Sequence, residues 1–206
     1  MPALMRTLSA EHLLAHMEDG RAYRREELGL LSGAVDRDLK RLVREGKVTR
    51  AAPGLYYRTR VSRWGALPIS SSELVRAFLR SEDFLLTSLD VFNGLGVGLT
   101  QLSNEFVVYN RKRIGKFKLD GHVYHFKRPH NFPRKEQVNN EYLLVDLLNN
   151  YEDLPEPPDG LWNSLRSCVR EMSPTYLEQT ARQYGKVSTN KKLKELLADE
   201  EKAAAT

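Results

Sequence analysis

The chain has 206 residues, of which 41% are hydrophobic, with a formal net charge of +5 and one cysteine. This length allows one large domain or two small ones, and Cys168 alone excludes an internal disulfide and any zinc site built from several cysteines. No apolar run reaches the roughly 18 to 20 residues that span a bilayer, and the apolar part of the N-terminus is too short for a secretory signal, so we expect a cytoplasmic protein with no membrane partner.

The first predicted helix begins at about Ser9, a residue type that often caps helix N-termini, and ends at Gly20. Its apolar residues recur at the spacing i, i+3, i+4 and i+7: Ala10, Leu13, Leu14 and Met17. A second, shorter helix is expected over residues 24–31, with Leu28 and Leu31 facing inward.

The third predicted helix, residues 34–45, has one apolar and one cationic face. Ser32 is placed to cap it and Gly46 to end it. The apolar face consists of Val35, Leu39, Leu42 and Val43, and the cationic face of Arg37, Lys40, Arg41 and Arg44. Such a helix alone is usually an ordinary solvated surface. A face lined only by cations nevertheless suits a nucleic-acid groove, where bases and phosphates offer acceptors and negative charge.

Two short strands, 48–50 and 55–58, are predicted around a tight turn at Pro53-Gly54. Three helices followed by a β-hairpin is the order of a winged helix, and this context favours DNA binding. Within such a unit Arg37 is best placed for base edges, because it lies near the N-terminus of the third helix. The remaining helix cations are expected to meet bases or phosphates, and Arg50 and Arg58 to position the protein on phosphates.

Residues 61–71 read as a linker, because they lack periodicity and contain Gly65, Pro68 and consecutive serines. Trp64 and Leu67 are expected to pack against one domain, since an exposed tryptophan is unusual. Helices are then predicted at 72–80 and 84–92, and the following Asn-Gly-Leu-Gly-Val-Gly run is interpreted as a helix stop and loop because it lacks the context of a nucleotide-binding loop.

Beyond residue 104 the period changes to that of strands. A buried strand is predicted at 105–109, and the strands 116–119 and 122–126 flank Asp120-Gly121, a strong hairpin signal. Helices resume afterwards, at 141–150, 161–172, 174–184 and 189–202.

Charge is segregated along the chain. Residues 21–63 hold twelve Lys or Arg against five acids, and residues 111–135 hold nine against Asp120 alone. Residues 136–160 carry seven acids, Asp146 among them, and no Lys or Arg. We therefore expect separate surfaces for an anionic partner and for solvent or a basic partner. The second basic patch contributes Arg111, Lys112 and Arg113 as further candidate contacts to neighbouring phosphates.

The sequence thus predicts an α+β protein with two domains. Residues 1–60 form a winged helix-turn-helix for DNA binding, residues 61–71 a linker, and residues 72–206 a mixed α/β domain with a small antiparallel sheet and a helical C-terminal end.

Enzyme and metal sites find little support in the sequence. His12 and His16 are spaced i, i+4 on one helix but have no evident third ligand, and His122 and His125 point to opposite faces of a strand. Asp90 and Glu105 imitate the carboxylates of a metal-dependent nuclease only loosely. We assign no catalytic residue, no metal and no cofactor.

The chain resembles the AbiEi-like antitoxins of type IV toxin–antitoxin systems, which are abortive-infection regulators of bacteria with an N-terminal winged helix. The resemblance is carried by LKRLVREGKVTRAAPGLYYR, residues 39–58, and by SSSELVRAFLR with FLLTSLDVFNGLGVGLTQLSNEFVVYN, within residues 70–110. It covers about the first two-thirds of the chain; from Glu152 onward only a helical tail is recognisable.

This resemblance implies an antitoxin that binds inverted repeats in its own promoter and represses its operon. It also implies a nucleotidyltransferase-like toxin as functional partner, counteracted without a stable complex, with the antitoxin role in the second domain. The family offers no motif that assigns that role to particular residues.

One alternative from another class stays open. The chain could serve as a protein-interaction or RNA-binding accessory module without an antitoxin role, in which the second basic patch matters more. Neither the operator sequence, the target of the toxin nor the oligomeric state follows from the sequence.

Overall fold

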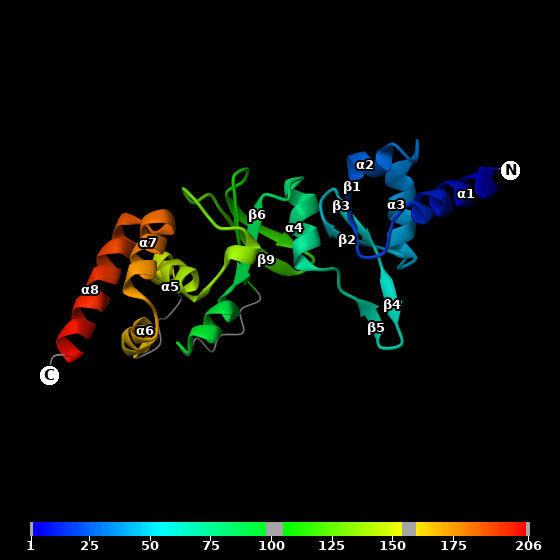
Figure 1. The fold of residues 1–206 in the computed structure, drawn as a ribbon. Coiled ribbons are helices and arrows are strands. Elements are labelled where there is room, and N and C mark those ends of the chain that lie inside the picture. Colours follow the sequence, from blue (N-terminus) through cyan, green and yellow to red (C-terminus); the bar gives the residue numbers. More distant parts are fainter. Residues whose placement is uncertain (1, 98–104, 154–159, 205–206) are drawn as a thin grey trace. The chain divides into compact units, whose positions relative to one another are not determined.

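The computed structural model describes residues 2–97, 105–153 and 160–204 (Figure 1). The protein is of the α+β class, with α-helices and small antiparallel sheets. Among the described residues, no helix combines the length and the apolar character that crossing a membrane requires. The chain divides into two compact units, each made of two segments. We call residues 1–84 with 112–126 the N-terminal unit, and residues 85–111 with 127–206 the C-terminal unit.

The N-terminal unit begins with three helices and a three-stranded sheet. The helices are α1 (Pro2–Ala15), α2 (Arg25–Gly29) and α3 (Val35–Arg44), and the strands are β1 (Ala22–Arg24), β2 (Val48–Ala52) and β3 (Leu55–Arg58). The strands lie in the order β1-β3-β2, all antiparallel. The predicted third helix is therefore confirmed to within one residue at each end, and Gly46 ends it with a φ of +70°.

Apolar faces of α1 and α3 build the core of this region. Ala10, Leu13 and Met17 pack with Leu39 and Leu42, all at most 1% exposed. The predicted stripes on both helices are thereby confirmed, except that Val43 is 38% exposed. Both predicted bounds are wrong: α1 runs from Pro2 to Ala15, so Met17 packs from the turn after it, and the Ser9 hydroxyl bonds to α3 instead of capping a helix.

The predicted linker contains a second hairpin, made of β4 (Arg60–Ser62) and β5 (Gly65–Leu67). Trp64 lies in its turn and is 84% exposed, while Leu67 is 41% exposed. The expectation that these two side chains are packed is therefore wrong, because within the described residues the hairpin's three-residue strands pair with each other alone.

The N-terminal unit also includes α4 (Ser71–Leu79) and the hairpin of β8 (Gly115–Leu119) and β9 (His122–Lys127) up to Phe126. The ring of Phe78 on α4 lies 5.0 Å from Phe117 and 5.2 Å from Phe126. The hairpin turn follows the prediction, with positive φ at Asp120 and Gly121. Its tip joins the first sheet, where the Asp120 amide donates to the Ala51 carbonyl (2.8 Å).

These units do not follow the expected division at residues 60 and 72. The reason is the hydrogen bonding of α4, whose Glu73 carboxylate accepts from the Ala22 amide at 2.9 Å. From β1, the Arg24 guanidinium donates to the carbonyls of Ala77 and Phe78 at the end of α4. These contacts join residues more than 50 positions apart, which local sequence patterns do not encode.

The C-terminal unit combines two strands with a helical bundle. β6 (Phe84–Ser88) neighbours β7 (Glu105–Asn110), and a 3-10 helix, η1 (Leu89–Leu95), follows β6. The predicted helix at 84–92 is therefore wrong: a short apolar run is compatible with strand and helix alike, and Leu85 is buried here against Tyr109 and Tyr142. The last residues of the glycine run, from Gly98, lie outside the described residues.

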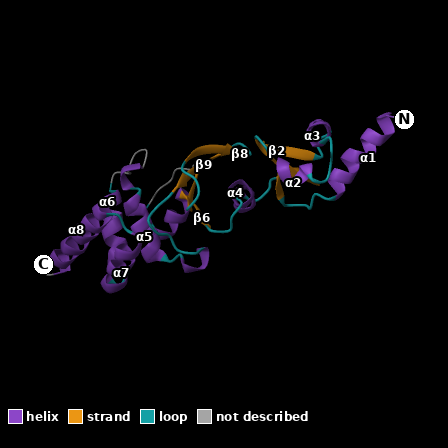
Figure 2. Cartoon of the chain, turned by 90° about the horizontal axis from the view of Figure 1, so that it is seen from above, coloured by secondary structure: helices purple, strands orange, loops and turns teal. Residues whose placement is uncertain are grey.

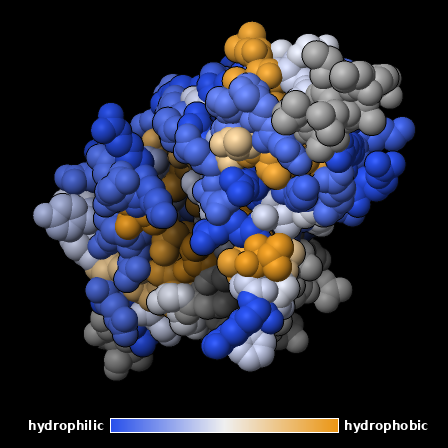
Figure 3. Space-filling view, turned by 90° about the vertical axis from the view of Figure 1, so that its right-hand side faces the viewer, coloured by the Kyte–Doolittle hydropathy of each residue, from blue (hydrophilic) through white to orange (hydrophobic). Residues whose placement is uncertain are grey.

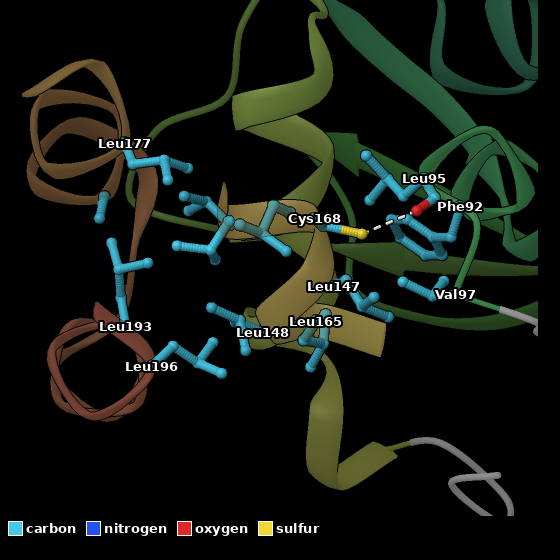
Figure 4. Packing of buried hydrophobic residues seen from close by; sticks show 14 of the residues in the cluster. Phe92, Leu95, Val97, Leu147, Leu148, Leu165, Cys168, Leu177, Leu193 and Leu196 are labelled. Atoms are coloured by element: carbon cyan, nitrogen blue, oxygen red, sulfur yellow. Dashed lines mark hydrogen bonds between the residues drawn. The ribbon is translucent and has the colours of Figure 1, made fainter. Parts of the chain in front are cut away.

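Four helices complete the C-terminal unit: α5 (Asn140–Asn149), α6 (Leu161–Arg170), α7 (Pro174–Tyr184) and α8 (Val187–Ala204). They pack side by side (Figures 1 and 2). Their core contains Leu147, Leu165, Leu177 and Leu196. Cys168 on α6 belongs to the same core, and its thiol donates to the Leu95 carbonyl of η1 at 2.7 Å (Figure 4). All four predicted helices are confirmed, and Cys168 is buried.

Candidate nucleic-acid interface

The exposed side of α3 carries most of the predicted nucleic-acid contacts. Because Val35, Leu39 and Leu42 face the core, the side chains on the opposite side of α3 point to solvent. Arg37, Lys40 and Arg44 are exposed, and Arg41 is partly buried. The face of the N-terminal unit seen in Figure 3 is predominantly hydrophilic, with apolar residues in separate groups.

Two acids in the first turn of α3 would weaken a cationic face, but both are held by other parts of the unit, and Asp38 reaches only Arg37 of that face, with Oδ1 3.6 Å from its Nε. The Asp36 carboxylate is bound by the Arg25 guanidinium through two hydrogen bonds, of 2.7 and 2.5 Å. These bonds lower the pKa of Asp36. Asp38 is 1% exposed, and its Oδ2 accepts from the hydroxyls of Ser9 and Ser32, each at 2.6 Å.

Asp38 therefore fixes the start of α3 to α1 and to the turn before α3. The negative charge lies in the first turn of the helix, where unpaired backbone amides favour it. The prediction that Ser32 caps α3 is wrong, because the N-cap residue is Ala34 and no side chain caps the helix; Ser32 instead accepts from the Ala34 amide at 3.1 Å, in the turn before it. Sequence reasoning missed Asp38, although an Asp among inward-facing positions of an amphipathic helix is the signal that would have revealed it.

Arg41 is less available than the other cations of α3. Its Nε donates to the Glu45 carboxylate at 2.6 Å, and Lys47 binds the same carboxylate at 3.0 Å. These bonds from Arg41 and Lys47 lower the pKa of Glu45. Arg41 would have to leave Glu45 in order to meet a base. By contrast, the described part of the chain offers no ion pair to Lys40 or Arg44.

The two predicted phosphate contacts of the β2–β3 hairpin differ. Arg50 is exposed on β2. Arg58 is held on β3: its Nε lies 3.2 Å from Asp19 and its Nη1 donates to the Met17 carbonyl at 3.3 Å. Arg58 thus ties β3 to the loop after α1, and of these two only Arg50 projects from the sheet without such bonds.

The β4–β5 hairpin adds a surface that the sequence interpretation assigned to a linker. Arg60 and Arg63 are exposed, and the Arg63 guanidinium lies 4.9 Å from the ring centre of Trp64. An exposed aromatic ring with a cation beside it is suited to bases and phosphates of a nucleic acid. Val61, 75% exposed, widens this apolar surface.

The Arg111–Arg113 patch is engaged with the protein itself. The Arg111 guanidinium lies over the Phe132 ring at 5.1 Å within the C-terminal unit. Within the N-terminal unit, the Lys112 ammonium donates to the carbonyls of Leu79 (3.2 Å) and Arg80 (2.7 Å), and Arg113 lies over Phe78 at 4.7 Å. Cations at the end of a helix satisfy its last carbonyls, so Lys112 has a structural role at the end of α4.

The candidate metal and catalytic groups remain apart. The rings of His12 and His16 lie 4.4 Å from each other, and His16 Nδ1 contacts the His12 carbonyl at 2.8 Å. Among the described residues no three His, Cys, Asp or Glu side chains converge as a metal site. Asp90 belongs to η1 and Glu105 begins β7.

The comparisons with known proteins give the fold and no more. No family model and no curated protein match the sequence. The structure is similar to the crystal structure of the Rv2827c protein from Mycobacterium tuberculosis, with a TM-score of 0.59 and 19% identity. The match covers 93% of this chain and 75% of that one.

Proposed function

We propose that this protein is the antitoxin and transcriptional autorepressor of a type IV toxin–antitoxin operon. It binds inverted repeats in its own promoter through a winged helix and counteracts a nucleotidyltransferase-like toxin through the rest of the chain. The resemblance to AbiEi-like antitoxins supports the antitoxin part of this proposal. The arrangement of the first 58 residues supports the part that concerns DNA.

Two features support a winged helix. The element order α1-β1-α2-α3-β2-β3, with the sheet order β1-β3-β2, is the one expected for that motif. In it α3 takes the place of the recognition helix, which lies in the major groove.

One observation carries the proposal of DNA binding. The exposed side of α3 presents Arg37, Lys40 and Arg44, while both acids of its first turn are bound elsewhere in the unit. Arg37 keeps one ion pair, with Asp38 Oδ1 at 3.6 Å, whereas Lys40 and Arg44 have none among the described residues and offer their full charge to DNA.

The test is a titration of the protein with its own upstream DNA, followed by fluorescence anisotropy. The double variant Arg37→Ala/Lys40→Ala is expected to bind at least tenfold more weakly, since each contact to a base is worth about 1 to 3 kcal/mol. The matched control, Lys191→Ala/Lys194→Ala, removes the same charge from exposed positions of α8 and should bind like the unaltered protein. Equal binding by both double variants would refute the role of α3.

The antitoxin role needs a separate measurement. Co-expression with the nucleotidyltransferase-like protein encoded next to it should restore growth, and the Arg37→Ala/Lys40→Ala variant should restore it equally, since this role is proposed for the second domain. Growth arrest that persists in the presence of the unaltered protein would overturn the antitoxin role while leaving DNA binding intact.

A second candidate, an RNA-binding accessory module, is favoured by the β4–β5 hairpin. Trp64 is exposed beside Arg63, and aromatic rings stack on unpaired bases with about 1 to 3 kcal/mol per base. If this candidate is right, Trp64→Ala weakens binding of a single-stranded RNA about tenfold and leaves binding of the promoter duplex unchanged. Absence of RNA binding by the unaltered protein would eliminate it.

A further inference from the structure

A cavity of about 370 Å³ lies within the C-terminal unit, and its lining includes no residue proposed for DNA binding. Five parts of the unit line it: the end of β7, the segment after β9, α5, the end of α7 and the turn before α8. This volume is within the range of small-molecule sites in proteins.

Asp146 on α5 lies at the floor of the cavity and is 2% exposed. Its Oδ1 accepts from the Tyr109 hydroxyl at 2.6 Å and from Asn150 Nδ2 at 3.2 Å. Its Oδ2 is buried and, among the described residues, has no hydrogen-bond partner. A buried carboxylate oxygen without a donor is costly, and native proteins leave few of them unsatisfied. The vacant position requires a donor, since an ionised carboxylate only accepts.

The floor is held rigidly. Asn150 also donates to the Tyr109 hydroxyl at 2.8 Å, and the Lys127 ammonium donates to Asn150 Oδ1 at 2.7 Å. On the opposite side, Asn149 accepts from the amide of Lys186 and from the Thr189 hydroxyl. The side chain that carries the unpaired oxygen is therefore oriented by a connected network, as binding sites require.

The rim of the cavity is cationic and its wall is partly aromatic. Lys127, Arg128 and Lys186 line it together with His130, and among the described residues no carboxylate other than Asp146 does so. The rings of Tyr142 and Tyr184, which meet edge to face at 5.3 Å, also line it. Cations around the rim favour an anionic group, and aromatic side chains favour a flat ring.

We propose that this cavity binds a small anionic molecule with a planar ring that carries an N–H group, the chemistry of a mononucleotide. The N–H group donates to Asp146 Oδ2, the ring lies against Tyr142 and Tyr184, and the phosphate meets Arg128 and Lys186 at the rim. Nothing in this proposal depends on DNA binding or on the antitoxin role.

The protonation of Asp146 supports the same assignment. Burial raises its pKa to about 6, although Tyr109, Lys127, Asn150 and Lys186 act in the opposite direction. The other ionisable groups that line the cavity are Tyr142 and Tyr184 from the helices, and Arg128 and His130 from the segment after β9. An N–H donor favours the ionised carboxylate, so binding should weaken as the pH falls below about 6.

The experiment is calorimetric titration of the full chain with GMP, AMP, CMP and UMP at pH 7.5, with guanosine and inorganic phosphate as separate probes. At least one mononucleotide is expected to bind, and to bind more tightly than inorganic phosphate. If that mononucleotide is GMP, it should also bind more tightly than guanosine. The Asp146→Asn variant should lose at least tenfold in affinity, because its amide can offer a donor where the ligand needs an acceptor.

The exposed rim provides a second variant that keeps every hydrogen bond of Asp146, although it removes the bond from Lys186 Nζ to the Asn149 carbonyl (2.7 Å). Arg128→Ala/Lys186→Ala should weaken binding of the mononucleotide at least tenfold and leave binding of the nucleoside unchanged. The control Lys191→Ala/Lys194→Ala should leave both affinities unchanged. The proposal is overturned if no mononucleotide binds, if phosphate alone binds equally well, or if both the floor variant and the rim variant bind like the unaltered protein.

Discussion

Two aspartates, one in each unit, are almost fully buried on a ten-residue helix, yet they are satisfied differently. Asp38 on α3 receives two hydroxyl donors on Oδ2. Its Oδ1 has no hydrogen-bond partner among the described residues but lies 3.6 Å from the Arg37 guanidinium. Asp146 on α5 receives its donors on Oδ1 and none on Oδ2 among the described residues. The first carboxylate fastens a helix and faces the Arg37 guanidinium with its remaining oxygen. The second is incomplete and lies at a cavity, which is the arrangement expected of a binding site.

Of the substitutions considered, Asp38→Ala is expected to lower the free energy of unfolding the most. Asp38→Ala leaves the hydroxyls of Ser9 and Ser32 without their acceptor and opens a small cavity between α1 and α3. We expect the free energy of unfolding to fall by about 2 to 4 kcal/mol, measured by urea denaturation. Asp36→Ala is the matched control, because Asp36 precedes it by two residues but is exposed and should matter far less. A loss no larger than that of the control would show that Asp38 does not hold α3.

At Asp146 the prediction concerns pH. Its pKa of about 6 in the folded chain is above the value of about 3.9 in the unfolded chain, so the folded state binds more protons between pH 4 and 6. The unfolding free energy therefore decreases as the pH rises through this window, by up to about 3 kcal/mol, and is unaffected by this group above it.

Asp146→Asn removes this dependence. The difference in unfolding free energy between the variant and the unaltered protein should thus grow in favour of the variant from pH 4 to pH 6 and then level off. Denaturation at five pH values is sufficient to measure it. A constant difference would mean that Asp146 titrates normally, and a difference that shrinks with pH would mean that its folded-state pKa is lowered.

The smallest change in the free energy of unfolding is expected for Tyr109, whose hydroxyl donates to Asp146. Tyr109→Phe removes the hydroxyl that donates to Oδ1, which should lower the unfolding free energy at pH 7 by about 1 to 2 kcal/mol. The loss should be smaller at pH 4, where the carboxyl is protonated and needs fewer donors. Tyr124→Phe, whose hydroxyl bonds to Ser71, serves as control and should show the same loss at both pH values.

Local patterns in the sequence were sufficient for most helices and for both hairpins that carry a glycine turn. The α3 helix follows from its apolar stripe and from Gly46, and the β8–β9 turn from Asp120-Gly121. These features depend on neighbours within a few residues, so the chain encodes them directly.

Long-range contacts account for what the sequence did not reveal. Asp146 belongs to an acidic stretch expected to face solvent or a basic partner, and only the packing of α5 against β7 and α7 buries it. In the same way, Arg58, Lys112 and Arg113 look like free cations in the sequence but meet Asp19, helix carbonyls and Phe78 in the folded unit. β6 was missed because five residues are too few to distinguish a strand from a helix.

Residues 112–126 belong to the N-terminal unit although they follow part of the C-terminal unit in sequence, and this order affects how the protein folds during translation. When the first 84 residues have emerged, α4 is complete, but the Ala51 carbonyl and the Tyr57 hydroxyl still lack Asp120, their partner in the finished unit. That partner leaves the exit tunnel only after the first strands of the other unit have been translated. A truncated gene that ends at codon 126 therefore preserves all of these bonds, whereas one that ends at codon 84 does not.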